Sequence, residues 1–320
     1  MSDYDKYLLR PVISNVNSRD DVDLSVDLGK GLVLKIPIIG SPMKGIMSIE
    51  LAEGLARFGG IGILHRFYDI VNDEGSWSND LTYLEKHNIL YGASVGLDDT
   101  FYKYILGHGA RILCIDIANG YLTTLLNFCN EVATYIEKNN LNALLMSGNV
   151  CTNDGVGELA RSGVDLIRFG IGTGHLCTTR KVTGIGRDQV DGLFDYTTSR
   201  IYNVKIISDG GIQSSGDAVK ALAFGANAIM LGSLLGKTYE SAHNGIIYGM
   251  ASRRLQEEYY HSTKSIEGTE EETSKNISLE EFIDEFCYGI KSACTYLNVK
   301  NLDGLRKEGC EQYRKYYVYK

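Results

Sequence analysis

The stretch Lys205-Ile206-Ile207-Ser208-Asp209-Gly210-Gly211 shows the unit from which this chain is built: a short apolar run that ends in a carboxylate and two glycines. Such a run, bounded by turn residues, is typical of a buried strand in a parallel sheet. Seven further runs of this kind recur along the chain, and the gaps between them are long enough for helices. The eight predicted strands are residues 35–41, 60–65, 91–95, 111–117, 143–149, 166–170, 205–209 and 228–232.

The alternation of strands and helices indicates repeated βα units. Helical periodicity fills the gaps at residues 48–57, 122–137, 155–161 and 216–224. Eight such units close into a barrel more readily than they form an open sheet, so we predict an α/β fold of the (β/α)8 TIM-barrel type. No linker rich in Pro, Gly or Ser divides the chain, and we therefore predict a single domain over residues 1–320.

One segment departs from this pattern. Residues 259–278 are polar and include the acidic run Glu267-Gly268-Thr269-Glu270-Glu271-Glu272, ahead of a helix predicted at residues 279–296. A solvated surface loop and a mobile lid over the barrel mouth both fit this composition, because lids are commonly polar. We assign residues 253–278 as the candidate lid.

The composition limits the classes of function. The chain has 320 residues, of which 44% are hydrophobic and 22% charged, as in soluble globular proteins. A net charge of −8 argues against a general binder of nucleic acid or membrane surfaces, and no run approaches about 20 apolar residues. The cysteines form no disulfide-like framework, which agrees with a reducing compartment. We therefore expect a cytoplasmic protein with a small-molecule partner.

Cys177 lies in the glycine-rich loop Gly170-Ile171-Gly172-Thr173-Gly174-His175-Leu176-Cys177-Thr178-Thr179-Arg180, after the sixth predicted strand. Exposed backbone N–H groups in such a loop favour a thiolate, so we predict covalent chemistry on a nucleotide. The alternative is a small buried hydrophobe. We prefer that alternative for the other six cysteines, which form no CxxC pair or metal-spaced cluster: Cys114, Cys129, Cys151, Cys287, Cys294 and Cys310.

The active site of a TIM barrel lies at the carboxyl ends of its strands. Asp209-Gly210-Gly211 and Gly232-Ser233 follow the seventh and eighth strands, where backbone amides often hold phosphate. Asp209 offers a carboxylate to ribose hydroxyls, although tight turns also use these residue types. Asp116 and Asn149 end the fourth and fifth strands, and each either orients a cofactor or base or serves an ordinary turn.

Two sequence patterns that are absent argue against particular kinds of site. The six histidines have no HxH or HExxH spacing, which argues against a catalytic metal. His65 either faces the mouth of the barrel or is a buried imidazole in the core. No GxGxxG follows the first strand, so we expect no Rossmann crevice.

Several blocks, taken in order, resemble the IMP dehydrogenase and GMP reductase family. Coverage runs from Leu8-Leu9-Arg10-Pro11 and Val22-Asp23-Leu24 to Cys294-Thr295-Tyr296, almost the whole chain. The blocks that carry the resemblance are Cys177-Thr178-Thr179-Arg180, Gly184-Ile185-Gly186, Asp209-Gly210-Gly211, Gly216-Asp217 and Met230-Leu231-Gly232-Ser233.

Within the family, the chain looks more like the reductases. Asp116-Ile117-Ala118-Asn119-Gly120-Tyr121 and Cys294-Thr295-Tyr296 are similar to reductase motifs. The regulatory insertion common in the dehydrogenases does not follow His65, and the lid has no clear Arg-Tyr pair of the kind that activates water. The resemblance therefore implies an NADPH-dependent GMP reductase; the alternatives are an NAD-dependent IMP dehydrogenase that forms XMP and a catalytically silent nucleotide-binding relative.

The resemblance also implies a mechanism, in which Cys177 attacks C2 of guanine, ammonia leaves and NADPH delivers a hydride to give IMP. Thr179 and Glu267 match residues that handle protons for the leaving amine. Asp116 matches a residue on the nicotinamide side, and the backbone carbonyls of Gly172, Gly174 and Cys177 match a monovalent-cation (K+) loop. A homotetramer is implied as well. The positions that match the nucleotide site are Met43, Asn149, His175, Asp209, Gly210, Gly211, Gly232, Ser233, Tyr248, Gly249 and Met250.

Four positions depart from the family pattern. His175 replaces a serine that contacts the 5′-phosphate, Lys44 replaces an aspartate, Lys264 stands where reductases often have arginine, and Ala251 replaces a serine. Neither histidine nor lysine reproduces a hydroxyl or a bidentate fork. GMP, dGMP and a modified guanine nucleotide therefore all stay open as the substrate.

Overall fold

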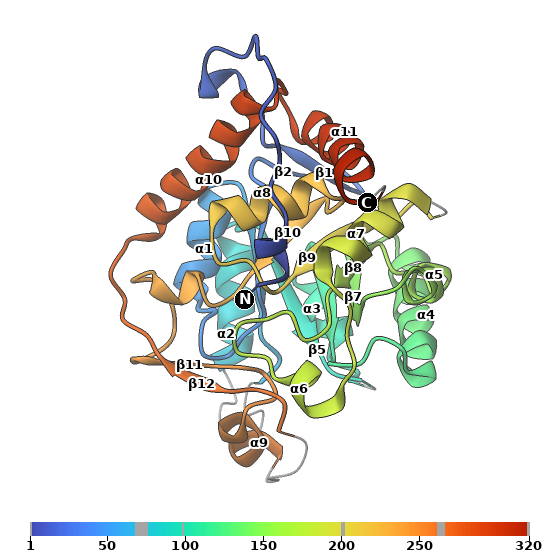
Figure 1. Cartoon of the computed structure of the whole chain (residues 1–320). Helices are drawn as coiled ribbons and strands as arrows, with labels where there is room; N and C mark the ends of the chain where they lie inside the picture. Colours follow the sequence, from blue (N-terminus) through green and yellow to red (C-terminus); the bar gives the residue numbers. More distant parts are fainter. Residues whose placement is uncertain (1, 68–75, 98, 200–201, 261–265, 319–320) are drawn as a thin grey trace.

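A closed barrel of eight parallel strands forms the centre of the computed structural model, which describes residues 2–67, 76–97, 99–199, 202–260 and 266–318 (Figure 1). Neighbouring strands follow one another in sequence, and β10 closes the ring by pairing with β3. This arrangement confirms the predicted TIM barrel and all eight predicted strands. The strands are β3 (Ile38–Gly40), β4 (Ile61–Leu64), β5 (Tyr91–Val95), β6 (Ile112–Asp116), β7 (Leu144–Val150), β8 (Leu166–Phe169), β9 (Lys205–Asp209) and β10 (Ala228–Leu231).

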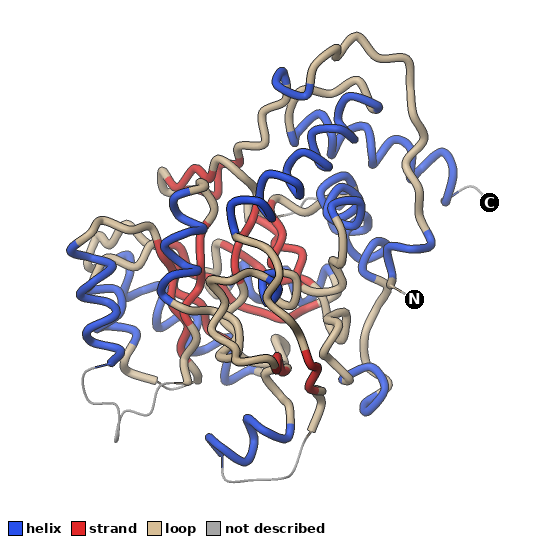
Figure 2. Tube along the Cα trace, turned by 90° about the vertical axis from the view of Figure 1, so that its left-hand side faces the viewer, coloured by secondary structure: helices blue, strands red, loops and turns tan. Residues whose placement is uncertain are grey.

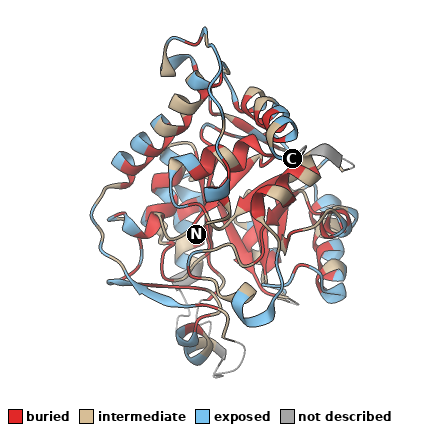
Figure 3. Cartoon of the chain, in the orientation of Figure 1, coloured by how far each residue is buried: buried red, intermediate tan, exposed pale blue. Residues whose placement is uncertain are grey.

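Helices surround the strands, with their apolar faces turned inward (Figure 3). In α4, for example, Leu125, Phe128, Cys129, Val132 and Ile136 recur at helical spacing and are all buried. The four predicted helices and the helix at residues 279–296 are confirmed. The helices are α1 (Ile49–Arg57), α2 (Ser76–Lys86), α3 (Tyr102–Gly107), α4 (Thr123–Lys138), α5 (Asn153–Arg161), α6 (Thr179–Thr183), α7 (Gln189–Ser199), α8 (Ser215–Ala223), α9 (Arg253–Tyr260), α10 (Leu279–Tyr296) and α11 (Leu302–Tyr313).

Short helical turns complete the chain. They are η1 (Asp3–Lys6), η2 (Arg19–Asp21), η3 (Leu235–Lys237) and the π-helical turn η4 (Arg314–Val318). Among the described residues, no helix has the length and apolar character needed to cross a membrane.

A hairpin that the sequence analysis missed covers the amino-terminal end of the barrel. Its strands β1 (Val26–Gly29) and β2 (Leu32–Leu34) pair antiparallel. Lys30 at the turn donates from Nζ to the carbonyl oxygen of Ala143 and to the Asp165 carboxylate, at 3.0 and 2.9 Å, just ahead of β7 and β8. The hairpin therefore seals the end of the barrel away from the predicted site.

A second hairpin lies at the opposite end of the barrel (Figure 1). Strands β11 (Ile246–Tyr248) and β12 (Glu270–Glu272) pair antiparallel, and α9 lies between them in sequence. Figure 2 shows α9 outside the ring of strands. The candidate lid at residues 253–278 thus contains α9 and β12, and its mobility stays a prediction.

The hairpin at the amino-terminal end provides a test of the fold. Replacing Leu34 by Ala should lower the free energy of unfolding by about 2–5 kcal/mol, because a fully buried leucine leaves a cavity when it is truncated. Val33 on the same strand is 57% exposed, so Val33→Ala should change the free energy of unfolding little. Urea unfolding of both variants measures the difference, and equal effects would contradict the sealing role.

Candidate active site

A cavity of about 440 Å³ opens at the carboxyl end of the barrel, where the fold prediction placed the site. Loops after six of the barrel strands and the segment between β11 and β12 line it. Most of the predicted residues meet there: Met43, Asp116, Asn149, Gly172, Gly174, His175, Cys177, Thr179, Asp209, Gly210, Gly211, Gly232, Ser233, Gly249, Met250 and Glu267.

Tyr248 is the predicted site residue that does not line the cavity. Its side chain is buried in a small cluster with Phe67 and Leu255. A side chain at Gly45 would meet the Tyr248 ring at 2.9 Å, so the ring fills the space beside that glycine. In this structure Tyr248 therefore packs against Phe67, which lines the cavity, without lining it itself.

Cys177 differs from the other cysteines in exposure. It is half-buried and lines the cavity, whereas the other six are buried. Burial raises the pKa of Cys114 to about 12 and those of Cys129 and Cys287 to about 11, which keeps these thiols protonated. The Cys177 sulfur lies 3.1 Å from Thr179 Oγ1, so the thiol and a hydroxyl are in hydrogen-bond contact.

Glycines let the loop of Cys177 pack directly against the loop after β9. Gly210 has a φ of +88°, and a Cβ there would lie 2.4 Å from Thr173 Oγ1 and 2.8 Å from the Gly174 nitrogen. Thr173 Oγ1 also donates to the Asp209 carbonyl oxygen at 2.8 Å. Gly210 is therefore required for a close approach, and any larger residue would push the cysteine loop outward.

The segment before β12 is joined to the cysteine loop by backbone hydrogen bonds. Thr178 donates to the Glu267 carbonyl oxygen at 2.8 Å, Thr269 donates to that of Leu176 at 2.8 Å, and Cys177 forms a bridge with Gly268. These contacts bring Glu267 to the cavity that holds Cys177, although 90 residues separate the two in sequence.

Arg168 is a site residue that the sequence analysis missed. It is 8% exposed on β8 and lines the cavity from inside the barrel. It donates from Nη1 to Asp116 Oδ1 at 2.5 Å and from Nε to Asp209 Oδ2 at 2.9 Å. Burial acts to lower the pKa of Arg168, but the two carboxylates outweigh it and hold that pKa well above the usual value. An arginine inside the apolar run LIRF was the available signal.

This buried cation orients the polar groups around it. Asn149 donates from Nδ2 to Asp209 Oδ2 at 2.8 Å and to the Gly170 carbonyl oxygen at 2.9 Å. Among the described residues, Asp209 Oδ1 and Asn149 Oδ1 receive no hydrogen bond. The cluster thus presents two fixed acceptor oxygens at the cavity wall, suited to hydroxyl or amide donors of a ligand.

His175 lies at the exposed edge of the cavity. Its Nδ1 is 3.2 Å from the amide nitrogen of Gln213, and its Nε2 is 2.7 Å from Glu271 Oε2 on β12. Both ring nitrogens are therefore engaged by the protein.

The remaining departures from the family pattern have different surroundings. Lys44 does not line the cavity and lies 3.6 Å from Glu258 on α9, whereas Ala251 does line it. Lys264 lies outside the described residues.

His65, a candidate mouth residue, does not line the cavity. Burial, together with Lys44, lowers the pKa of His65 to about 3, so its imidazole is neutral at physiological pH.

No group of three or more His, Cys, Asp or Glu side chains that could hold a metal ion occurs within the described part of the chain. A monovalent cation would use backbone carbonyls instead. The Gly174 carbonyl oxygen accepts a hydrogen bond from the Cys177 N–H at 3.0 Å, which fixes one part of that loop.

Comparison with known proteins finds one matching family and several relatives that share most of the chain. The family model described as IMP dehydrogenase / GMP reductase domain matches residues 2–315. A GMP reductase of Buchnera aphidicola is 31% identical over 323 aligned residues, which cover 94% of this chain and 90% of that protein. GMP reductase 2 of Bos taurus is 32% identical over 92% of this chain and 89% of its own length. GMP reductase 2 of Homo sapiens is 31% identical over 95% and 92%.

The buried ion cluster predicts an asymmetry between arginine substitutions. Arg168→Met should lower the free energy of unfolding by about 3–5 kcal/mol, because it removes from two buried carboxylates the cation that contacts both. Arg161→Met removes an arginine whose ion pair with Glu158 is on the surface and should leave the unfolding midpoint near that of the unmodified protein. Chemical denaturation of both variants measures this, and an unchanged midpoint for Arg168→Met would contradict the cluster's role.

Proposed function

The chain belongs to the IMP dehydrogenase / GMP reductase family, and we propose that it is an NADPH-dependent GMP reductase that converts GMP to IMP and ammonia. The observation that carries this proposal is the meeting of an accessible Cys177, the Thr179 hydroxyl and Glu267 in one cavity. The relatives named GMP reductase support the direction of the reaction. Cys177 acts as the nucleophile in this scheme.

Binding of the nucleotide is proposed to use the glycine loops. Gly211, Gly232 and Ser233 line the cavity, and their backbone N–H groups would suit a 5′-phosphate. Arg168 holds the Asp209 carboxylate through Oδ2, and the other oxygen, Oδ1, suits the ribose hydroxyls. Met43 and Met250 line the cavity as well and offer apolar surface to the base. Since both ring nitrogens of His175 already contact Glu271 and Gln213, we propose that this residue shapes the phosphate end of the cavity without bonding the phosphate itself.

The covalent step begins with attack of the Cys177 sulfur on C2 of the guanine ring. The bond from C2 to the amino nitrogen then breaks, and ammonia leaves a thioimidate on the enzyme. Thr179 Oγ1, 3.1 Å from the sulfur, is suited to pass a proton toward the departing amine, with the Glu267 carboxyl group as the partner acid. Reduction at C2 finally breaks the carbon–sulfur bond and releases IMP.

A nicotinamide cofactor fits the opposite part of the same cavity. Ile117 and Ala118 line it beside Asp116, whose carboxylate is held by Arg168, so an apolar wall and a fixed acceptor lie together there. NADPH, when bound, supplies the hydride that C2 accepts. We also propose a K+ ion at the carbonyls of Gly172, Gly174 and Cys177, and a homotetramer located in the cytosol.

The nucleophile provides the direct test of the reaction. Cys177→Ala should lower the rate of GMP-dependent NADPH oxidation by at least about a thousandfold, because the covalent route is lost. Cys287→Ala removes a buried thiol on α10 instead and should keep most of the activity. The absorbance of the reduced cofactor reports both rates. Undiminished turnover in Cys177→Ala would refute the scheme, and reduction of NAD with IMP would point to a dehydrogenase.

A substrate series tests the proposed ribose and phosphate contacts. GMP should have the highest kcat/KM, because dGMP lacks one hydroxyl for Asp209 and guanosine lacks the phosphate. Each loss should lower kcat/KM by roughly ten- to a hundredfold, the range expected for a hydrogen bond to a charged group. Equal turnover of GMP and dGMP would show that Asp209 does not read the 2′-hydroxyl. Equal turnover of guanosine would show that the glycine loops do not bind phosphate.

A further inference from the structure

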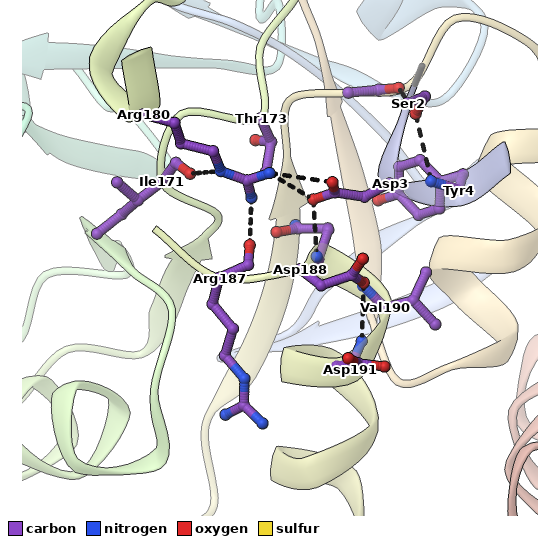
Figure 4. Close-up of polar contacts among 12 residues, drawn as sticks. Ser2, Asp3, Tyr4, Ile171, Thr173, Arg180, Arg187, Asp188, Val190 and Asp191 are labelled. Carbon is purple, nitrogen blue, oxygen red and sulfur yellow. Dashed lines mark hydrogen bonds and ion pairs between the residues drawn. The ribbon is translucent and has the colours of Figure 1, made fainter. Parts of the chain in front are cut away.

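The segment at residues 2–4 lies against the loop that carries Cys177, although more than 170 residues separate them in sequence (Figure 4). The Asp3 carboxylate accepts two hydrogen bonds from Arg180 Nη1, at 3.0 and 2.8 Å. The same carboxylate accepts from the backbone N–H of Gln189 at 2.9 Å. Ser2 Oγ donates to the Gly211 carbonyl oxygen at 3.1 Å, so the segment touches two loops of the site.

Arg180 links the two ends of the cysteine loop. Its Nε donates to the Ile171 carbonyl oxygen at 2.8 Å, and its Nη2 donates to the carbonyl oxygen of Arg187 (Figure 4). One guanidinium group therefore ties the start of the loop, the stretch after α6 and Asp3 together.

Two glycines make the space that the Arg180 side chain occupies. Gly172 has a φ of +67°, and a Cβ there would lie 2.4 Å from Arg180 Cγ. Gly186 has a φ of +153°, and a Cβ there would lie 2.7 Å from Arg180 Nε. The backbone on both sides is thus shaped around this one side chain, which indicates a fixed position rather than a loose surface contact.

The segment that carries Asp3 is itself anchored in the barrel. Tyr4 is fully buried, and its hydroxyl lies 2.8 Å from Ser208 Oγ on β9. Lys220 Nζ on α8 donates to the Tyr4 carbonyl oxygen at 2.8 Å. Asp3 therefore reaches Arg180 from a rigid base, and its side chain is only 16% exposed.

We infer that Asp3 is a positioning residue for catalysis: through Arg180 it holds the loop on which the Cys177 sulfur meets the Thr179 hydroxyl. Arg180 directly follows Thr179, the first residue of α6, so a shift of Arg180 moves Thr179 Oγ1 relative to the sulfur. The catalytic consequence rests on the function proposed above, whereas the bracing of the loop rests on geometry alone. Misplacing reacting groups by about 1 Å costs up to about a hundredfold in rate.

The first experiment compares Asp3→Asn with Lys6→Met. Lys6 also joins this segment to the stretch after α6, through Asp188 at 2.6 Å, but it does not contact Arg180. Asp3→Asn should lower kcat at least about tenfold, with KM for GMP changed less than about threefold and the unfolding midpoint near that of the unmodified protein. Lys6→Met should leave kcat unchanged. Equal kcat in both variants, or a loss confined to KM, would overturn the inference.

A double-mutant cycle tests whether Asp3 acts through Arg180. Arg180→Met should lower kcat on its own, and adding Asp3→Asn to it should cause no further loss, because the partner is already absent. Losses that multiply would mean that Asp3 acts by another route, such as its contact with Gln189, and would refute the inferred path.

Hydrogen exchange tests whether Asp3 holds the cysteine loop, independently of the proposed reaction. In the ligand-free protein, backbone amides of residues 171–187 should exchange faster in Asp3→Asn than in Lys6→Met. This result is expected whether or not any purine is turned over, so the brace is testable even if the GMP reductase proposal fails. Unchanged exchange together with unchanged kcat would exclude the positioning role of Asp3 and would leave the proposed chemistry of Cys177 unaffected.

Discussion

A single positive charge inside the barrel governs the geometry of the cavity. Arg168 is buried, and a buried charge is tolerated only when it is paired and hydrogen-bonded. Asp116 and Asp209 meet this requirement from β6 and β9, two strands that do not neighbour each other. The pairing therefore fixes the carboxyl ends of four consecutive strands, with Asn149 on β7 joined through Asp209. The oxygen atoms that face the cavity owe their direction to this cluster.

The rest of the site comes from loops and from segments outside the barrel strands. The glycines around Thr173 and Arg180 let three loops approach one another closely. The segment before β12 then adds Glu267 through backbone hydrogen bonds to the cysteine loop, and Asp3 contacts the same loop through Arg180. The chemistry thus depends on tertiary contacts at a distance in sequence, while the barrel supplies the platform.

Much of the fold was predictable because the barrel strands are largely apolar runs that end near turn residues. The hairpin β1–β2 was not, since its strands bury only alternate residues, unlike the mostly buried strands of the barrel. Cys177 and the glycine loops after β9 and β10 could be located from composition and spacing. Glu267 could be assigned only from family resemblance, because strand pairing, invisible in the sequence, brings it to Cys177. Arg168 and Asp3 were missed because an arginine in a strand and an aspartate near the amino terminus carry no motif of their own.

The contrast between Arg168 and His175 has a consequence for how such a site diverges over time. Arg168 pairs with both Asp116 and Asp209 inside the barrel, so replacing this arginine alone leaves two buried carboxylates without it. His175 and its partner Glu271 are both exposed, so replacing His175 leaves a carboxylate that water can still solvate. Substitutions should therefore accumulate first at the rim of the cavity, around His175, while the buried wall around Arg168 changes only as one unit.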